Sequence, residues 1–257
     1  MQHSRKIRYI IAFLLLSISV LVLVAMNVCI GTVKISLEDI IASIGGRQVN
    51  NSRILWDIRM PRTMAALILG GALALAGYLL QTFFHNPIAG PFVLGISSGA
   101  KMVVALVMVF LMGQAIRVSS VTLIAAAFLG AMISMGFVLL MSRKVNNMSM
   151  LVVSGVMIGY ICSAVTELVV TFANDAEIVN LHNWSRGSFS GMTWDNVIVM
   201  AVVITVTFVI VFFMAKPLSA YQLGESYAQN MGVNIRLLRV ALVILSSILS
   251  ACIVAFA

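Results

Sequence analysis

The sequence predicts an all-α fold, a polytopic bundle of transmembrane helices, and two observations carry this prediction. First, 61% of the residues are hydrophobic and only 9% are charged, whereas soluble domains carry about 25% charged residues. Second, seven apolar runs are long enough to cross a bilayer as helices, which takes about 20 residues each. So few charges cannot cover an aqueous surface. We therefore expect an integral membrane protein with one transmembrane domain over residues 1–257.

The first apolar run follows three basic residues, as the core of a signal peptide does. It extends over about 22 residues, however, whereas a signal peptide has a core of about 7–15 residues and ends in a small-residue cleavage site. We expect it to be retained as the first span, with a cytoplasmic N-terminus because Arg5, Lys6 and Arg8 precede it.

The seven runs lack strand-like alternation, and backbone inside a membrane must satisfy its own hydrogen bonds, so each run is expected to be a helix. The polar connection after the first run predicts a short surface helix that starts at Ser36 and is closed by Gly45 and Gly46. The expected spans are residues 9–30, 62–84, 93–112, 120–141, 151–172, 196–215 and 238–257.

The second run carries two local features. Small residues at helical spacing, Ala66, Gly70, Ala74 and Gly77, predict close packing against another helix. The run ends in HNPIAGP, residues 85–91, where each residue before a proline is disfavoured in a helix. This segment is either a hairpin between antiparallel helices or a bend that lines a pore.

Composition narrows the function. The net charge of +8 is scattered through short loops rather than along one face, which disfavours nucleic-acid binding. The 17 methionines are spread over nearly every span, as flexible apolar side chains are, and do not indicate metal transport. The cysteines and histidines lack ligand spacing, so neither a disulfide framework nor a metal site is expected. These residues are Cys29, Cys162, Cys252, His3, His85 and His182.

Two ionisable residues, Lys101 and Glu167, lie inside apolar runs. A charge at the bilayer centre costs at least about 2.5–3.5 kcal/mol, so both are candidates for a transport pathway. The alternatives remain open: Lys101 can extend its long side chain to the membrane surface, and Glu167 can reach the opposite interface.

The stretch WDIRMPRTM, residues 56–64, places Arg59 and Arg62 on either side of Pro61, directly before the second run. With the N-terminus in the cytoplasm these arginines lie outside, against the positive-inside rule. From the residues alone, contact with lipid phosphates explains them.

Three motifs, in this order, resemble the FecCD-type permeases, the membrane subunits of ATP-driven importers for ferric siderophores, haem and cobalamin. Residues 59–100 resemble the family's R-x-P-R, N-P-L-A-x-P and L-G-x-S-x-G-A pattern. NWSRGSFSGMTW, 183–194, resembles its W-x-x-G-S-x-x-G-x-x-W segment, and LGESYAQNMGV, 223–233, resembles its L-G-E-x-x-A-x-x-L-G-V segment.

The resemblance implies ten helices per subunit, and the family continues beyond the position of Ala257 with a glycine-rich segment, so the chain is expected to be incomplete at its C-terminus. It implies a permease subunit in a bacterial cytoplasmic membrane, with ferric siderophore as the first expectation for the cargo and haem or cobalamin as the alternatives. The implied partners are a second permease subunit, identical or related, two ATPase subunits and an extracytoplasmic binding protein. The chain has no G-x-x-x-x-G-K-[ST] motif, so ATP is expected on a partner; no covalent chemistry and no cofactor is expected here.

The resemblance also implies site residues. Arg59 and Arg62 would meet acidic residues of the binding protein. The turn after the second run and the start of the fifth would form the cytoplasmic gate. The gate residues are Asn86, Ile88, Asn147, Met148 and Ser149.

The segment 223–233 is expected to couple the permease to the ATPase. Leu223, Tyr227 and Met231 are four residues apart, and no Lys or Arg lies between Lys216 and Arg236, which favours a protein partner over lipid headgroups. The residues implied by the family motif are Leu223, Gly224, Glu225, Ala228 and Gly232.

Two alternatives come from other classes. An ion-coupled secondary carrier would place its site at a broken helix such as HNPIAGP, but it needs intramembrane acids, and only Glu167 is available. An assembly factor or a channel would leave the segment 223–233 without a purpose.

Overall fold

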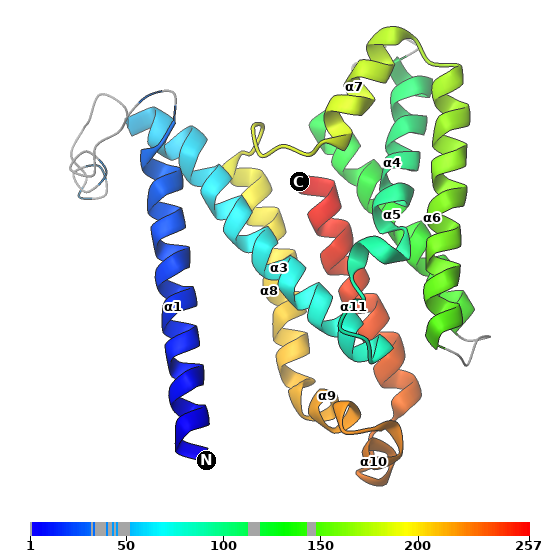
Figure 1. Ribbon diagram of the computed structural model, residues 1–257. Coiled ribbons are helices and arrows are strands. Elements are labelled where there is room, and N and C mark those ends of the chain that lie inside the picture. Colours follow the sequence, from blue (N-terminus) through cyan, green and yellow to red (C-terminus); the bar gives the residue numbers. More distant parts are fainter. Residues whose placement is uncertain are drawn as a thin grey trace. The chain divides into compact units, whose positions relative to one another are not determined.

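The computed structural model of the chain describes residues 2–31, 33, 40, 43, 45, 52–112, 119–142 and 148–257. Within these residues every regular element is a helix, which confirms the all-α prediction (Figure 1). The surface helix predicted after the first span lies mostly outside the described residues. The elements in chain order are α1 (Gln2–Cys29), η1 (Ile54–Arg59), α3 (Met60–Phe84), η2 (Pro91–Leu94), α4 (Ile96–Val107), η3 (Met108–Met112), α5 (Ser120–Ser142), α6 (Met148–Thr171), α7 (Asp175–Ser185), α8 (Trp194–Phe213), α9 (Ala215–Gln222), α10 (Glu225–Asn230) and α11 (Ile235–Phe256).

The chain contacts divide into two compact units. The first unit contains Met1–Leu67 and Ser190–Val197, so it holds α1, η1, the beginning of α3 and the first residues of α8. The second unit contains Ile68–Phe189 and Ile198–Ala257, with the remaining elements. Each unit has its own packing, described below.

Six described helices are long and apolar enough to cross a membrane, which agrees with six of the seven expected spans. They are Lys6–Cys29, Ile54–Phe84, Ser120–Met141, Met150–Thr171, Trp194–Phe213 and Ile235–Phe256.

The expected span at 93–112 differs from the other six. Its first residues form the short 3₁₀ helix η2, and Gly95, at a φ of 70°, separates η2 from α4. Because a left-handed residue cannot continue a helix, the apolar helix that remains is the shorter stretch Ile96–Leu111.

The core of the second unit is a bundle of α4, α5, α6 and α11, which lie side by side in Figure 1. α4 and α5 cross at Gly99 and Gly130, where a Cβ atom added to Gly99 would lie 2.6 Å from the Gly130 carbonyl oxygen and 1.9 Å from Ser134 Oγ. α6 approaches in the same way, since a Cβ atom on Gly95 would lie 2.8 Å from the backbone nitrogen of Gly159. Small residues therefore set the spacing of these helices.

The small-residue stripe of α3 does not make the close contact predicted for it. Ala66, Gly70 and Ala74 are exposed, and no described atom lies within 4 Å of a Cβ atom built on Gly70 or Gly77. The stripe faces outward, so the tight crossings of the bundle lie elsewhere.

In the first unit, α1 is exposed to its surroundings along its apolar length. Its C-terminal end packs against η1 through a small cluster of Val28, Ile40 and Leu55. One polar contact joins α1 to α3: Thr63 Oγ1 donates to Asn27 Oδ1 at 2.9 Å. An exposed apolar helix of this length is suited to lipid contact.

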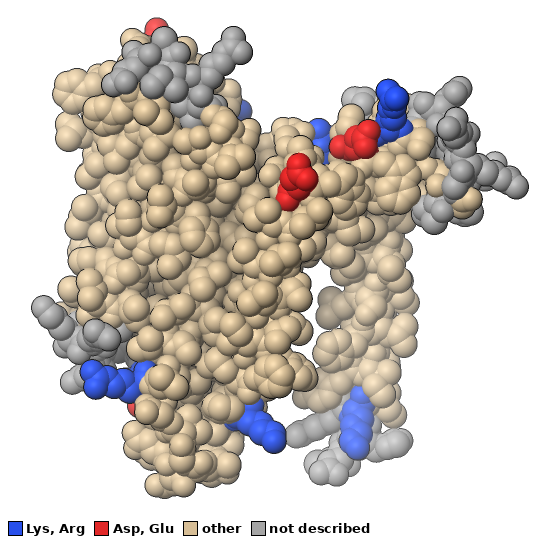
Figure 2. Space-filling model, turned by 180° about the vertical axis from the view of Figure 1, so that it is seen from behind, with Lys and Arg blue, Asp and Glu red and all other residues tan. Residues whose placement is uncertain are grey.

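Charged side chains gather near the ends of the helices. On the face shown in Figure 2, the described Lys, Arg, Asp and Glu residues leave the middle of the helices uncharged. This distribution is the one a bilayer requires, because its hydrocarbon core excludes unpaired charges.

Candidate functional site

The connection between α8 and α11 is built as two short helices between glycines. α9 ends at Gln222, and Gly224, at a φ of 128°, redirects the chain into α10. Gly232, at a φ of 82°, ends this segment. Both conformations are strained for residues with a Cβ atom, so the two glycines of the LGESYAQNMGV motif have a backbone reason to be there.

One side of α9 and α10 exposes large apolar side chains. Leu223 is 71% exposed, Tyr227 50% and Met231 61%. These three residues, here called the partner face, border an open groove of about 430 Å³. The other residues that line the groove are Ala215, Lys216, Ser219 and Ala220.

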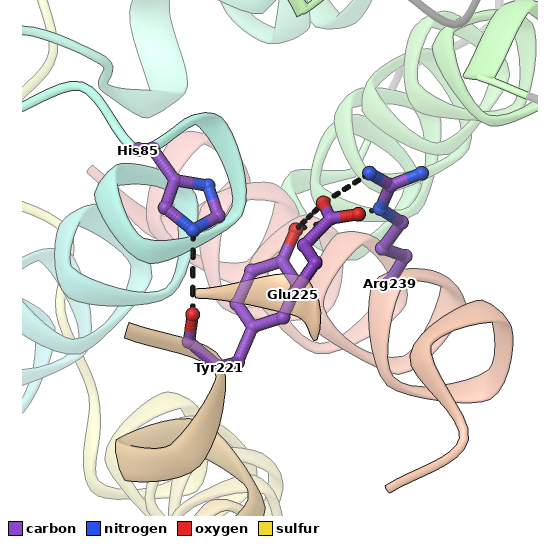
Figure 3. Close-up of polar contacts among 4 residues, drawn as sticks. All are labelled: His85, Tyr221, Glu225 and Arg239. Atoms are coloured by element: carbon purple, nitrogen blue, oxygen red, sulfur yellow. Dashed lines mark hydrogen bonds and ion pairs between the residues drawn. The ribbon is translucent and has the colours of Figure 1, made fainter. Parts of the chain in front are cut away.

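The opposite side of α10 is buried. Ala228 is fully buried, so it lets α10 pack closely within the chain and is not exposed to a partner. Glu225 forms an ion pair with Arg239 of α11 (Figure 3). The Glu225 carboxylate therefore anchors α10 to α11, and its predicted part in coupling stays a prediction.

Tyr221 is the centre of this buried side and is 0% exposed. Its hydroxyl donates to Glu225 Oε1 at 3.1 Å and accepts from Arg239 Nε at 3.4 Å. Burial raises the pKa of the Tyr221 phenol, because the phenolate would lose its hydration; the hydrogen bond from Arg239 opposes this rise.

The end of α3 meets α9 at the same place. The His85 ring lies over the Tyr221 ring, with 4.7 Å between centroids, and His85 Nε2 is 3.4 Å from the Tyr221 carbonyl oxygen (Figure 3). Gln222 Nε2 donates to Tyr78 Oη at 3.2 Å and to Thr82 Oγ1 at 3.1 Å. These contacts could not be predicted from the sequence, because residues about 140 positions apart carry no local pattern that pairs them.

The predicted gate residues are described in part. Asn86 Oδ1 accepts from the Ile88 backbone N–H at 3.0 Å, and the Ile88 side chain is 83% exposed at the turn after α3. Asn147 lies outside the described residues. α6 begins at Met148, and the side chains of Met148 and Ser149 are likewise outside what the structure describes. Their role as a gate stays a prediction.

Arg59 has a structural role that the sequence did not predict. It is 8% exposed, and its guanidinium donates to the carbonyl oxygens of Val28 at 2.5 Å, Cys29 at 3.1 Å and Val33. The carbonyl groups at the end of a helix lack intrahelical partners and carry the negative end of its dipole. Arg59 thus caps α1. Its docking to a binding protein stays a prediction.

Arg62 is placed differently. Its Nη2 donates to the Ser190 carbonyl oxygen at 2.7 Å on the exposed surface, while its Nε is buried and has no hydrogen-bond partner among the described residues. Close by in the first unit, Trp194 Nε1 donates to the Trp56 carbonyl oxygen at 2.8 Å. Hydrogen bonds from the side chains of Arg62 and Trp194 therefore hold the beginning of α8 against α3 and η1.

Lys101 and Glu167 lie on different helices. Lys101, half-buried on α4, borders a cavity of about 650 Å³ in the second unit. Glu167 is exposed on α6, and its carbonyl oxygen accepts from Thr171 Oγ1 at 2.9 Å. The other residues that line the cavity are Phe92, Ser97, Ser98, Ser163, Trp184, Ser185, Arg186, Gly187, Ser188, Phe189, Ile253, Val254 and Ala257.

Comparison with known proteins agrees with these motifs. The FecCD transport family matches residues 18–257. Vitamin B12 import system permease proteins BtuC from Salmonella typhi and from Salmonella newport (strain SL254) are each 34% identical over 245 residues, which cover 95% of this chain and 71% of the relative. The fold also matches a solved structure described as an inward-facing conformation of a metal-chelate type ABC transporter. That match has a TM-score of 0.79 and 25% identity, and it covers 93% of this chain and 73% of that one. The chain therefore belongs to the FecCD transport family, as a permease subunit of an ABC importer.

Proposed function

We propose that this permease carries cobalamin or a closely related corrinoid. The observation that supports this cargo is the 34% identity, over 95% of this chain, to permeases named for vitamin B12 import. Ferric siderophore, ranked first from the sequence, has less support from these relatives. The solved structure with a similar fold is named for a metal chelate.

The proposed energy source is ATP hydrolysed by a separate subunit that binds the partner face. Leu223, Tyr227 and Met231 expose large apolar side chains in the polar connection between α8 and α11. Such a patch is typical of a protein-binding surface. With the N-terminus assigned to the cytoplasm, α9 and α10 also lie on the cytoplasmic side, where ATP is available.

The proposed delivery site for an extracytoplasmic binding protein is the surface around Arg59 and Arg62, where η1 meets the beginning of α3. Arg62 is the better candidate for direct contact, because its guanidinium reaches the exposed surface at Ser190. Arg59 supports this surface from within, by capping α1. Charged pairs at such an interface mainly set the register and the rate of association.

The proposed path for the cargo runs between this chain and a second permease subunit. Glu167 is exposed on an apolar helix, and a carboxylate facing lipid is costly, so a water-filled path is the better environment for it. Asn86 and Ile88, with Asn147, Met148 and Ser149, are proposed as the gate at the cytoplasmic end. Lys101 is assigned to the same pathway from its position on α4.

The test is uptake by cells that lack other cobalamin, haem and siderophore permeases. The chain is co-expressed with the ATPase and the binding protein of its own import system. Labelled cyanocobalamin, haem and a ferric hydroxamate are offered in parallel, and an ATPase variant without catalytic activity serves as the control. Uptake of cyanocobalamin alone is expected. Uptake of the ferric hydroxamate or of haem instead would overturn the proposed cargo, and uptake that survives the inactive ATPase would overturn the proposed energy source.

A further inference from the structure

Tyr221 has a different neighbour on each of its sides. Its carbonyl oxygen and ring face His85, which follows α3, and its hydroxyl is bonded to Glu225 of α10 and Arg239 of α11. The next residue, Gln222, donates to two residues in the last turns of α3, Tyr78 and Thr82. We call His85, Tyr221, Gln222, Glu225 and Arg239 the Tyr221 junction.

His85 adopts an unusual backbone conformation at this junction. Its φ of 49° is the one positive value among the described residues other than glycine. A side chain disfavours this left-handed conformation, which persists when the surroundings hold it. The surroundings of His85 are the Tyr221 ring and carbonyl, so contact with α9 maintains the conformation from which the HNPIAGP turn begins.

The partner face begins next to the residues that contact His85 and the end of α3. Leu223 of the partner face directly follows Tyr221 and Gln222, and Tyr227 lies on the same short helix as Glu225. Tyr221 is fully buried, so it cannot change its contacts independently of its neighbours. A displacement of α9 and α10 therefore acts on the end of α3 through side chains already in contact.

We propose that the Tyr221 junction makes the coupling segment and the 85–91 turn move as one body, so that ATP-driven displacement of α9 and α10 shifts the turn directly. This inference rests on the proposed function, in which an ATPase binds the partner face. His85 and Gln222 are positioning residues in this scheme: they transmit movement to the turn and do not touch the cargo.

The direct test measures distances within the assembled complex. Spin labels are placed at Ile88, which is 83% exposed in the turn, and at Ser226, which is exposed on α10. The distance between them is recorded without nucleotide and with ADP–vanadate trapped on the ATPase. A single distance that stays the same in both states is expected. A shift of more than about 3 Å, half a helical turn, would overturn the proposal.

Two substitutions separate the junction from the backbone strain. His85→Gly accepts the positive φ but removes the ring, and Gln222→Ala removes both hydrogen bonds to α3. In both variants the label distances are expected to differ between the two states, and cyanocobalamin uptake per ATP hydrolysed is expected to fall about tenfold. Gln81→Ala, the same change at an exposed glutamine of α3 outside the junction, is the matched control and should retain wild-type coupling.

A purely structural role predicts another pattern. If His85→Gly and Gln222→Ala lower ATP hydrolysis and uptake in equal proportion, or lower neither, the junction does not transmit movement. If the wild-type complex shows no ATP hydrolysis stimulated by the binding protein, the proposed function fails, and this proposal fails with it. Failure of the junction alone leaves wild-type stimulation intact, so the two results are distinguishable.

Discussion

The guanidinium of Arg59 donates a hydrogen bond to the carbonyl oxygen of Val28 at 2.5 Å, across 31 residues of sequence. Val28 belongs to the last turn of α1, which contains no basic residue of its own. An arginine from the beginning of the second span therefore supplies the positive charge that the C-terminal end of the first span lacks.

Substitution of Arg59 should destabilise the protein. Arg59→Ala removes donors to three buried or half-buried carbonyl groups, and hydrogen bonds to charged groups are worth about 1.5–3 kcal/mol each. We expect a clear fall in the melting temperature of the detergent-solubilised protein. Arg59→Lys keeps the charge but has fewer hydrogen-bond donors, so its melting temperature should lie between those of Arg59→Ala and the wild type. An unchanged melting temperature in Arg59→Ala would show that the cap contributes little.

Substitution of Arg62 should act on binding instead. Arg62→Glu reverses a charge at the exposed surface, where Nη2 bonds the Ser190 carbonyl oxygen. We expect the extracytoplasmic binding protein to bind at least about tenfold more weakly, because charges at the rim of an interface govern association. Surface plasmon resonance at low salt measures this affinity. The melting temperature should change less than in Arg59→Ala. An unchanged affinity for the binding protein would instead support contact between Arg62 and lipid headgroups.

The crossing of α4 and α5 should not tolerate a methyl group at Gly99. In Gly99→Ala the added Cβ atom would lie 2.6 Å from the Gly130 carbonyl oxygen, and backbone cannot move aside as a side chain can. Overpacking of this kind costs about 1–3 kcal/mol. Gly136→Ala on α5, where no described atom lies within 4 Å of the new Cβ, is the matched control. Equal melting temperatures for the two variants would contradict the observed crossing.

Substitution of the partner face should separate assembly from folding. Leu223→Asp places a charge on an apolar side chain that is 71% exposed, so the fold should persist while the ATPase subunit binds more weakly. Co-purification of the ATPase should fall by about tenfold. Gln229→Asp adds the same charge at an exposed site of α10 outside the partner face. If both variants retain the ATPase equally, another surface binds it.

Tyr221 should make stability fall at alkaline pH. Burial raises its pKa in the folded protein above the value of about 10 for an unfolded chain. The neutral phenol therefore stabilises the folded state fully below pH 10, and this contribution is lost as the pH rises from there through the folded pKa. Tyr221→Phe should lower stability by about 1 kcal/mol at pH 8 by removing hydrogen bonds. It should also flatten the decline of the melting temperature between about pH 9 and 11. A decline as steep as that of the wild type would contradict the assignment.

The membrane fold could be read from run length and charge alone, because lipid leaves helices as the available way to satisfy the backbone. One apolar run is an exception to this prediction. The run at 93–112 looks like the other six in hydropathy, yet Gly95 takes a left-handed conformation and shortens the helix. A glycine permits both a helix and its end, so the residue type alone cannot decide between them.

Small residues give a second example of what the sequence can predict and what it cannot. Gly70 and Gly77 have the spacing of a helix crossing, yet no described atom lies within 4 Å of a Cβ atom built on either, whereas Gly99 and Gly130, on different helices, make the crossing. Periodicity identifies the residues on one face of a helix, but the helix that meets that face depends on how all the helices pack together.

The sequence by itself determined that the chain is a helical membrane protein with the three motifs of a FecCD permease, since hydropathy and motif spacing are local properties. Only the tertiary structure decided what the motif residues touch: Arg59 turns inward to cap α1, Ala228 is buried, and Glu225 binds Arg239 rather than lying free on the partner face. The physical reason is that carbonyl groups, buried surface and opposite charges find partners in space, and those partners lie at separations along the chain that no local pattern records.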